Sequence, residues 1–321
     1  MYMPVWLQAG FYSIGADNMI AALFIFIILL AAAFAALVFR SAWERKQLSL
    51  ERYFVDMRRD DPVRTDPEGG HIKFAFLSDL HDYCRDNGTD KIITVLEKEQ
   101  PAMVLLGGDM FTCMKHREWA ADVGPSLDLI RELAKRWAVV YAEGNHEARL
   151  RDRHPDSFEA YSRALEQAGV INLRNRSVVL NGVVIHGITM DEDYYRRLIP
   201  VFGTKKPMPQ DYILKKLGMP QKDKINILMM HSPMYLEEAA AWGADLVLSG
   251  HFHGGTIRLP LPGRPGLMTP QFQFFVKECS GMHTSGNGRT KMIVSRGIGT
   301  HSVDIRFNDL PEISMIEMNF S

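Results

Sequence analysis

Residues 72–81 read IKFAFLSDLH, an apolar run that ends directly in Asp79 and His81. This arrangement recurs along the chain, because four more runs with the length and content of buried strands end in a residue that can bind metal. The other runs are 103–106 before Asp109, 138–141 before Asn145 and His146, 225–230 before His231, and 246–248 before His251 and His253. These five strand ends are the basis for predicting both the fold and the site.

Segments with helical periodicity lie between several of these strands, at 90–99, 126–136, 156–168 and 236–242. Strands that alternate with helices predict an α/β core with parallel pairing, and sites in such sheets form at the carboxyl ends of the strands. Asn181-Gly182, between apolar runs at 178–180 and 183–185, predicts a hairpin. We therefore expect mixed sheets, completed by late strands at 291–295 and 313–318.

Met19 to Phe39 forms an uncharged apolar run near the amino terminus. As a helix it would extend roughly 30 Å, the thickness of a bilayer core, so we predict a transmembrane helix. A cleaved signal peptide would need a shorter apolar stretch and preceding positive charge, and no Lys or Arg precedes this run. Positive charges follow it at Arg40, Arg45, Lys46 and Arg52. The positive-inside rule then predicts a single-pass membrane protein with a cytoplasmic catalytic domain.

The expected domain organisation has four parts. Residues 1–18 form a short N-terminal segment, 19–39 the transmembrane helix, and 40–70 a charged tether that could remain helical to Met57. The globular domain is expected at 71–321, with an insertion at 191–224.

The composition of the chain limits which binding partners and which cellular compartment we expect. The formal net charge of -1 gives no basic excess, so nucleic acid is not expected as a partner. Cys84, Cys113 and Cys279 lie far apart and form no C-x-x-C pair, which favours reduced thiols in a reducing compartment. Cys84 and Cys113 are close in sequence to the predicted metal ligands and could contact those ligands without binding metal themselves.

The residues at the strand ends predict a site for two divalent metal ions. Asp, Asn and His together suit Mn, Fe, Zn or Ni better than Mg or Ca, and we favour Mn. Asp79 and His81 can converge on one ion, His251 and His253 could face different ions, and Asp109 is the natural bridge. The predicted ligands are Asp79, His81, Asp109, Asn145, His231, His251 and His253.

Two ions about 3.5–4 Å apart would polarise a phosphate and hold a deprotonated bridging water. We expect His146 to point away from the metals, where a protonated imidazole could donate to the leaving group or stabilise the transition state. A lone histidine at a strand end is usually structural, but five such motifs together are not. The remaining histidines are interpreted as structural: His71, His116, His154, His186, His283 and His301.

The blocks D-x-H, G-D, G-N-H-[DE], a lone H and G-H-x-H occur here in this order, from Asp79 to His253. The set resembles the calcineurin-like metallophosphoesterase superfamily. Residues 250–260, 295–300, 305–307 and 311–313 further resemble its membrane-associated bacterial branch, often called YkuE-like. The resemblance covers nearly all of residues 71–320.

The resemblance implies a four-layer αββα sandwich with mixed sheets and two metal sites that share Asp109. One metal would be held by Asp79, His81, Asp109 and His253, and the other by Asp109, Asn145, His231 and His251, with His146 as the catalytic histidine. Phe252 and Thr256 depart from the branch, so the pocket edge is expected to differ. The residues after Asp109 lack the arginine of protein Ser/Thr phosphatases, and Thr112 stands where purple acid phosphatases have a tyrosine ligand.

The substrate is less well defined than the reaction class. Segment 191–224 is basic and aromatic, and is either a solvated surface insertion or a lid that meets anionic lipid or substrate phosphates. Arg149, Arg196 and Arg197 are predicted to bind substrate. Some anchored members of the superfamily hydrolyse the pyrophosphate of UDP-2,3-diacylglucosamine in lipid A synthesis, which the similar layout suggests here. The alternatives are a general membrane-associated phosphodiesterase acting on envelope or lipid-derived diesters, and a non-catalytic metal-binding membrane scaffold.

Overall fold

The computed structural model describes residues 16–57, 70–81, 83, 88–113, 122–195, 205–300 and 304–320. The chain separates into two compact units, one ending at Trp43 and a catalytic unit from Glu44 to Ser321. Within the first lies most of helix α1 (Ala16–Glu44). Residues Asn18–Glu44 of this helix are long and apolar enough to cross a membrane, and the most apolar window is exposed throughout. An N-terminal helix of this kind serves either as an anchor or as a signal sequence.

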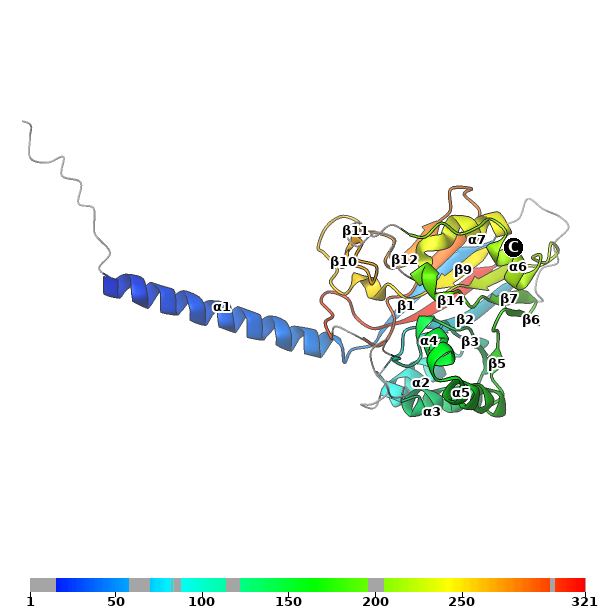
Figure 1. Ribbon diagram of the computed structural model, residues 1–321, viewed down its shortest axis with the longest axis horizontal. Coiled ribbons are helices and arrows are strands. Elements are labelled where there is room, and N and C mark those ends of the chain that lie inside the picture. Colours follow the sequence, from blue (N-terminus) through cyan, green and yellow to red (C-terminus); the bar gives the residue numbers. More distant parts are fainter. Residues whose placement is uncertain are drawn as a thin grey trace, which may run out of the picture. The chain divides into compact units, whose positions relative to one another are not determined.

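Two six-stranded sheets form the catalytic unit (Figure 1). The first contains, in spatial order, β1 (Ser49–Asp56), β14 (Glu312–Asn319), β2 (His71–Leu77), β3 (Met103–Leu106), β4 (Ala138–Tyr141) and β5 (Ile171–Asn172). The second contains β12 (Gly281–Thr284), β13 (Lys291–Val294), β9 (Leu246–Ser249), β8 (Asn226–Met229), β7 (Val183–Gly187) and β6 (Arg176–Leu180). In both sheets the strands that lead into the predicted ligands are parallel, while β14, β12 and β6 each have an antiparallel neighbour. The predicted mixed α/β architecture is therefore confirmed.

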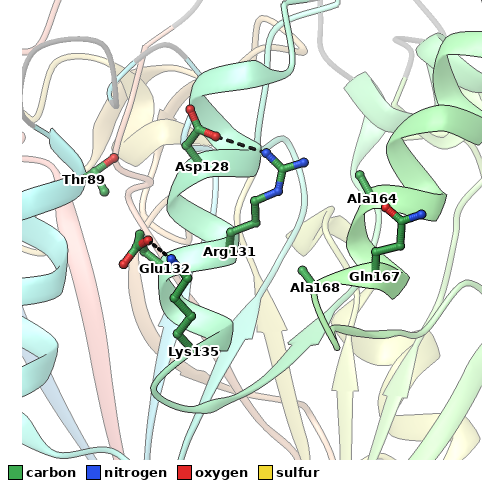
Figure 2. Close-up of a pocket in the computed structure, with 8 residues that line it drawn as sticks. All are labelled: Thr89, Asp128, Arg131, Glu132, Lys135, Ala164, Gln167 and Ala168. Carbon is green, nitrogen blue, oxygen red and sulfur yellow. Dashed lines mark hydrogen bonds and ion pairs between the residues drawn. The ribbon is translucent and has the colours of Figure 1, made fainter.

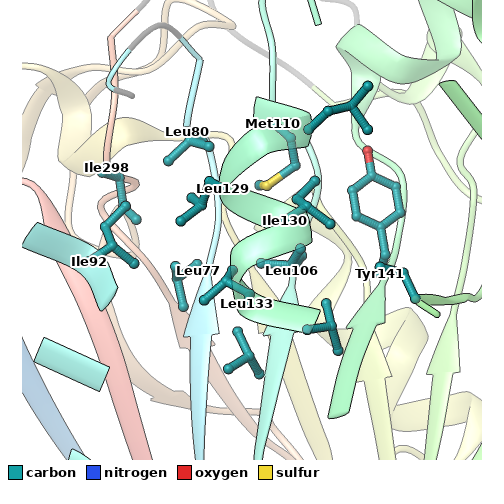
Figure 3. Packing of buried hydrophobic residues seen from close by; sticks show 14 of the residues in the cluster. Leu77, Leu80, Ile92, Leu106, Met110, Leu129, Ile130, Leu133, Tyr141 and Ile298 are labelled. Atoms are coloured by element: carbon teal, nitrogen blue, oxygen red, sulfur yellow. The ribbon is translucent and has the colours of Figure 1, made fainter. Parts of the chain in front are cut away.

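Three apolar clusters show how the layers pack. One lies between the two sheets and includes Phe76 of β2 and Ile227 of β8. On the other face of the first sheet, Leu129, Ile130 and Leu133 of α3 (Gly124–Ala134) pack over the strands (Figure 3). The same layer contains α2 (Gly88–Glu99), α4 (Asn145–Arg153) and α5 (Pro155–Gln167), and the outer layer of the second sheet contains α6 (Tyr212–Leu217) and α7 (Leu236–Trp242). Each sheet thus has one face on its partner and one face under helices.

Within the predicted tether at 40–70, residues 49–56 instead form an edge strand of the first sheet. β1 pairs in parallel with β14 from Ser49 opposite Glu312 to Asp56 opposite Asn319. Val55 is buried in the inter-sheet cluster, while Arg52 lies on the other face and donates two hydrogen bonds of 2.7 Å to the Glu99 carboxylate. Alternation of apolar and charged residues is typical of an edge strand, and the charges concealed it in the sequence.

Segment 191–224 is packed against the catalytic unit where it is described. Tyr194 and Tyr195 of η3 (Glu192–Tyr195) and Tyr212 of α6 are buried in the outer cluster of the second sheet. Four of its six lysines have acidic partners: Lys205 contacts Glu238, Lys206 contacts Asp193, Lys215 contacts Asp211 and Lys216 contacts Asp191. Because these four cations are paired, they do not support a basic lid.

Candidate active site

The predicted ligands lie in the loops that follow β2, β3, β4, β8 and β9, at one edge of the two sheets. Backbone hydrogen bonds join these loops directly: Asp79 N–H donates to the Gly108 carbonyl at 3.0 Å, and Gly250 N–H donates to the His231 carbonyl at 3.0 Å. The two sheets are joined by His231, whose Nδ1 donates to the Gly107 carbonyl at 2.8 Å. All seven predicted ligands are buried.

Five of the seven predicted ligands have a left-handed backbone. The φ angles are 53° at Asp79, 46° at His81, 54° at Asp109, 69° at His251 and 47° at His253. This region is uncommon for residues other than glycine, and such residues cluster at functional sites. Strained loops of this kind aim several side chains at one point, which a regular strand cannot do because its side chains alternate.

Close approach of backbone to carboxylate requires glycine at two positions beside the ligands. A Cβ atom on Gly250 would meet Oδ2 of Asp79 at 2.1 Å, and one on Gly144 would meet Oδ1 of Asp109 at 2.3 Å. In the space this leaves, His251 N–H donates to the Asp79 carboxylate, and His146 N–H donates to Oδ1 of Asp109 at 2.8 Å. The glycines of the motifs therefore let the backbone fix the orientation of both carboxylates.

The ligand atoms form overlapping clusters within 4.8 Å: Asp79 with His81 and His253, Asp109 with His231 and His251, and His81 with Asp109 and His146. In the first, His253 Nε2 lies 3.3 Å from Oδ1 of Asp79 and 3.3 Å from Nε2 of His81. In the second, His231 Nε2 lies 3.0 Å from Oδ2 of Asp109. The clusters are compatible with the predicted division into two sets sharing Asp109, which stays a prediction at the level of individual ligands.

Two observations fit a cation in the second cluster. Nε2 of His231 is buried and lacks the geometry of a hydrogen bond, although Asp109 is near. The Asn145 amide places one end 2.8 Å from Nδ1 of His251 and 3.2 Å from Oδ2 of Asp109, and its oxygen occupies that end. The amide, imidazole and carboxylate groups that converge here are of the types that bind a divalent metal ion. The structure thus contains a buried His/Asp metal site.

The charges of the site hold a proton where a metal would bind. Burial would lower the pKa of His231, but the carboxylates of Asp109 and Asp79 raise it to about 10. Burial raises the pKa of Asp109, yet the positive charge of His231 beside it holds that pKa well below the usual range. Metal ligands must be deprotonated, so a divalent cation and the His231 proton compete for the same electron pair.

Metal binding is therefore expected to release protons. In the metal-free chain, His231 stays protonated as the pH rises from its ordinary pKa of 6.5 towards about 10. Because this pKa is raised on folding, the associated stabilisation is complete below pH 6.5 and is lost as the pH approaches 10. At pH 8, calorimetry of Mn²⁺ binding in buffers of different ionisation enthalpy should show about one proton released at this site. Proton release that is absent at pH 8 would contradict this assignment of His231.

His146 does not point away from the cluster as expected. Asn145 and His146 begin α4, and Nε2 of His146 lies 3.9 Å from Oδ2 of Asp109. Its Nδ1 accepts a 2.7 Å hydrogen bond from the Cys113 N–H. Since Nδ1 is an acceptor, the ring proton resides on Nε2, facing the site. His146 is thus arranged as a neutral hydrogen-bond donor rather than as the protonated imidazole we predicted.

Of the predicted substrate-binding arginines, Arg149 is at the site, and Arg196 and Arg197 lie outside the described residues. NH1 of Arg149 is 3.4 Å from Nε2 of His146, and Nε is 3.7 Å from Oε1 of Glu192. A guanidinium beside a buried metal cluster is well suited to hold a phosphate oxygen.

Three supporting residues were missed from the sequence. The Glu147 carboxylate accepts hydrogen bonds from the N–H groups of Asp109 and Met110, each 2.9 Å long, and from Tyr141. Burial and the negative charge of Asp109 raise the pKa of Glu147 to about 7. Gln271 contacts Nε2 of His251 at 2.5 Å and donates to the Tyr195 carbonyl at 3.1 Å. The motif letter E at 147 could have signalled the first, and Tyr195 directly precedes the predicted substrate-binding Arg196, whereas no motif lies near Gln271.

A hollow of about 580 Å³ on the outer helical layer lies apart from this chemistry. Figure 2 shows it between α3 and α5, with Asp128 bonded to Arg131 and Glu132 to Lys135. Its charged residues thus have partners within the hollow, and none of its lining residues belongs to the His/Asp clusters.

The fold and the buried His/Asp site define a metal-dependent phosphoesterase. Residues 72–255 match the calcineurin-like phosphoesterase family, and the chain belongs to that family. It is similar to the uncharacterized metallophosphoesterase YkoQ of Bacillus subtilis, at 24% identity over 90% of this chain and 98% of that protein. It is also similar to the B. subtilis metallophosphoesterase YkuE, at 26% over 77% and 79%, and to the phosphodiesterase YaeI of Escherichia coli, at 25% over 77% and 82%. The predicted enzyme class and the predicted superfamily are confirmed.

Proposed function

We propose that the chain is a membrane-anchored phosphodiesterase or pyrophosphatase that uses two divalent cations and acts on an amphiphilic phosphate ester. The observation that carries this is the juxtaposition of the buried ligand clusters with Nε2 of His146 and the guanidinium of Arg149. The cations supply positive charge that polarises the phosphate and lowers the pKa of water. A phosphorus centre needs in addition a donor for the leaving oxygen and a cation for the non-bridging oxygens.

The residues of this chain divide these tasks. The predicted ligands hold the cations, and Asp109 is the residue placed between the two sets. His146 donates from Nε2, because the Cys113 N–H fixes its tautomer. Arg149 binds a phosphate oxygen, and Glu147 holds the backbone of Asp109 in its left-handed conformation.

The proposed membrane location is supported by α1, whose length and composition suit a bilayer span. The relative named phosphodiesterase supports a diester as substrate. UDP-2,3-diacylglucosamine, a pyrophosphate attached to a diacylated sugar, remains our specific candidate, with other envelope or lipid-derived diesters as the alternative. We keep the cytoplasmic orientation, since positive charge follows α1.

Turnover is tested with the full-length chain in detergent, on bis-p-nitrophenyl phosphate with Mn²⁺. His146→Ala should lower kcat by about 10²-fold, since it removes the donor to the leaving group. His71→Ala, which changes an exposed histidine of β2, is the matched control and should retain the rate. No hydrolysis with any divalent metal would instead support the non-catalytic scaffold.

Substrate and orientation need experiments in cells. Rescue of cells depleted of their UDP-diacylglucosamine hydrolase would support the specific candidate, and failure of a well-expressed, membrane-localised chain would exclude it in favour of other diesters. A C-terminal alkaline phosphatase fusion that is active in the periplasm would overturn the cytoplasmic orientation.

A further inference from the structure

Three phenylalanines are exposed on the hairpin formed by β10 (Gly266–Met268) and β11 (Phe274–Val276). Phe272, Phe274 and Phe275 are 41%, 54% and 60% exposed. We call these three residues the hairpin surface. The rings of Phe274 and Phe275 lie 6.3 Å apart, so the two can be covered together. Aromatic groups gathered in this way mark a surface that another phase or molecule covers.

The backbone holds these rings outward in an unfavourable conformation. Phe272 and Phe275 have φ angles of 60° and 57°, in the left-handed region that bulky residues rarely adopt. Hydrogen bonds close the turn: Phe272 N–H donates to the Thr269 carbonyl at 2.8 Å, and Thr269 N–H donates to the Gln273 carbonyl at 2.9 Å. The backbone thus keeps Phe274 and Phe275 more than half exposed, as a surface available to another molecule or phase.

The same hairpin is fastened to the loop that carries His251 and His253. Gln271, in the turn beside Phe272, is buried and contacts Nε2 of His251. A Cβ atom on Gly266 would meet Cα of Gly255 at 2.7 Å, and Cys279 Sγ lies 3.2 Å from the Gly254 carbonyl. Whatever covers the hairpin surface therefore lies next to the active site.

We propose that the hairpin surface inserts into the headgroup region of an anionic bilayer and so brings the active site to substrate in that bilayer. The inference rests on the membrane location in the proposed function. Residues 256–285 carry three basic side chains, Arg258, Arg264 and Lys277, and one acidic side chain, Glu278, so charge favours anionic lipid. Phenylalanine beside basic residues is typical of interfacial membrane contacts.

The proposed transmembrane helix keeps the catalytic unit close to a bilayer. α1 ends at Glu44 and β1 begins at Ser49, so the catalytic unit follows a membrane-length helix after only a few residues. β10 and β11 lie at the edge of the catalytic unit (Figure 1). A bilayer surface suits this hairpin better than a second copy, because basic side chains on both copies would face each other.

Insertion is tested by fluorescence of the full-length chain reconstituted in phosphatidylcholine–phosphatidylglycerol vesicles containing brominated lipid. The Phe275→Trp variant, compared with wild type, should show at least about twofold stronger quenching than the Val179→Trp variant, which alters an exposed residue of β6. Adding Arg264→Glu and Lys277→Glu should reduce the extra quenching to its value in phosphatidylcholine alone.

Equal quenching of the two tryptophan variants would overturn the proposal. So would concentration-dependent crosslinking through position 275 without quenching, which would assign the surface to a second copy. The readout requires no turnover, so an inactive chain that still shows the specific quenching would contradict the proposed function and leave membrane insertion intact. In an active chain, Phe274→Ser with Phe275→Ser should lower the ratio of vesicle-borne to water-soluble diester hydrolysis by about fivefold.

Discussion

The Asp109→Asn variant is expected to lose on the order of 10³-fold in kcat, with little change in fold. Asp109 belongs to two of the three ligand clusters, and its Oδ2 lies 3.0 Å from Nε2 of His231. An amide of nearly the same shape keeps the hydrogen bond at Oδ1 but removes the negative charge that both cations would share. The rate on bis-p-nitrophenyl phosphate and the bound metal per chain, by mass spectrometry, measure the two effects.

Asp128→Asn is the matched control, because Asp128 is an exposed carboxylate on α3 outside the clusters. It should retain both activity and metal content. If Asp109→Asn kept full metal content and lost only rate, the carboxylate would act in chemistry and not as the shared ligand. Wild-type activity in Asp109→Asn would contradict the site.

Arg306→Leu is expected to lower the free energy of unfolding by about 3–5 kcal/mol. Arg306 is fully buried and donates hydrogen bonds to the carbonyls of Arg296, Gly297 and Gly299. Its partner Asp309, 3.3 Å away, would be left as a buried charge. Burial raises the pKa of Asp309 to about 6, against the effect of Arg306, so loss of the arginine favours its protonation further.

The loss should extend to the metal site, because Gly299 N–H donates to the Asp79 carbonyl at 2.7 Å. Chemical denaturation followed by tryptophan fluorescence measures the stability, and Arg163→Leu, at an exposed arginine of α5, should leave it within about 0.5 kcal/mol. Adding Asp309→Leu to Arg306→Leu should recover part of the loss, since both partners of the pair are then apolar. If Arg306→Leu alone were as stable as wild type, the buried Arg306–Asp309 pair would contribute nothing to the free energy of unfolding.

Sequence patterns predicted the parts of the fold in which local and tertiary preferences agree. The strands ending in Asp79, Asp109, Asn145, His231 and His251 were predicted within a residue or two, because each is a buried parallel strand and reads as a continuous apolar run. The helices at α2, α3, α5 and α7 show clear amphipathic periodicity. α4 was missed because its first turn is made of motif residues, whose side chains serve the site.

Other features depend on contacts between distant parts of the chain. β1 carries Glu51, Arg52 and Asp56, and its pairing with β14 is visible only once both ends of the domain are placed together. Gln271 reaches His251 from a hairpin with no catalytic motif, and the tautomer of His146 depends on the Cys113 backbone. The lysines of 191–224 read as a basic patch because their acidic partners, such as Glu238 for Lys205, come partly from elsewhere in the sequence.

The order of strands in the first sheet has a consequence for how the protein is made. β14 lies between β1 and β2, so the strand that directly follows α1 has no hydrogen-bonding neighbour until residues 312–319 have been synthesised. Until then β2, which leads into Asp79, is an open sheet edge, and pairing over such a sequence separation is slow. Assembly of the first sheet thus depends on β14, which can pair with β1 and β2 only after residues 312–319 have been synthesised.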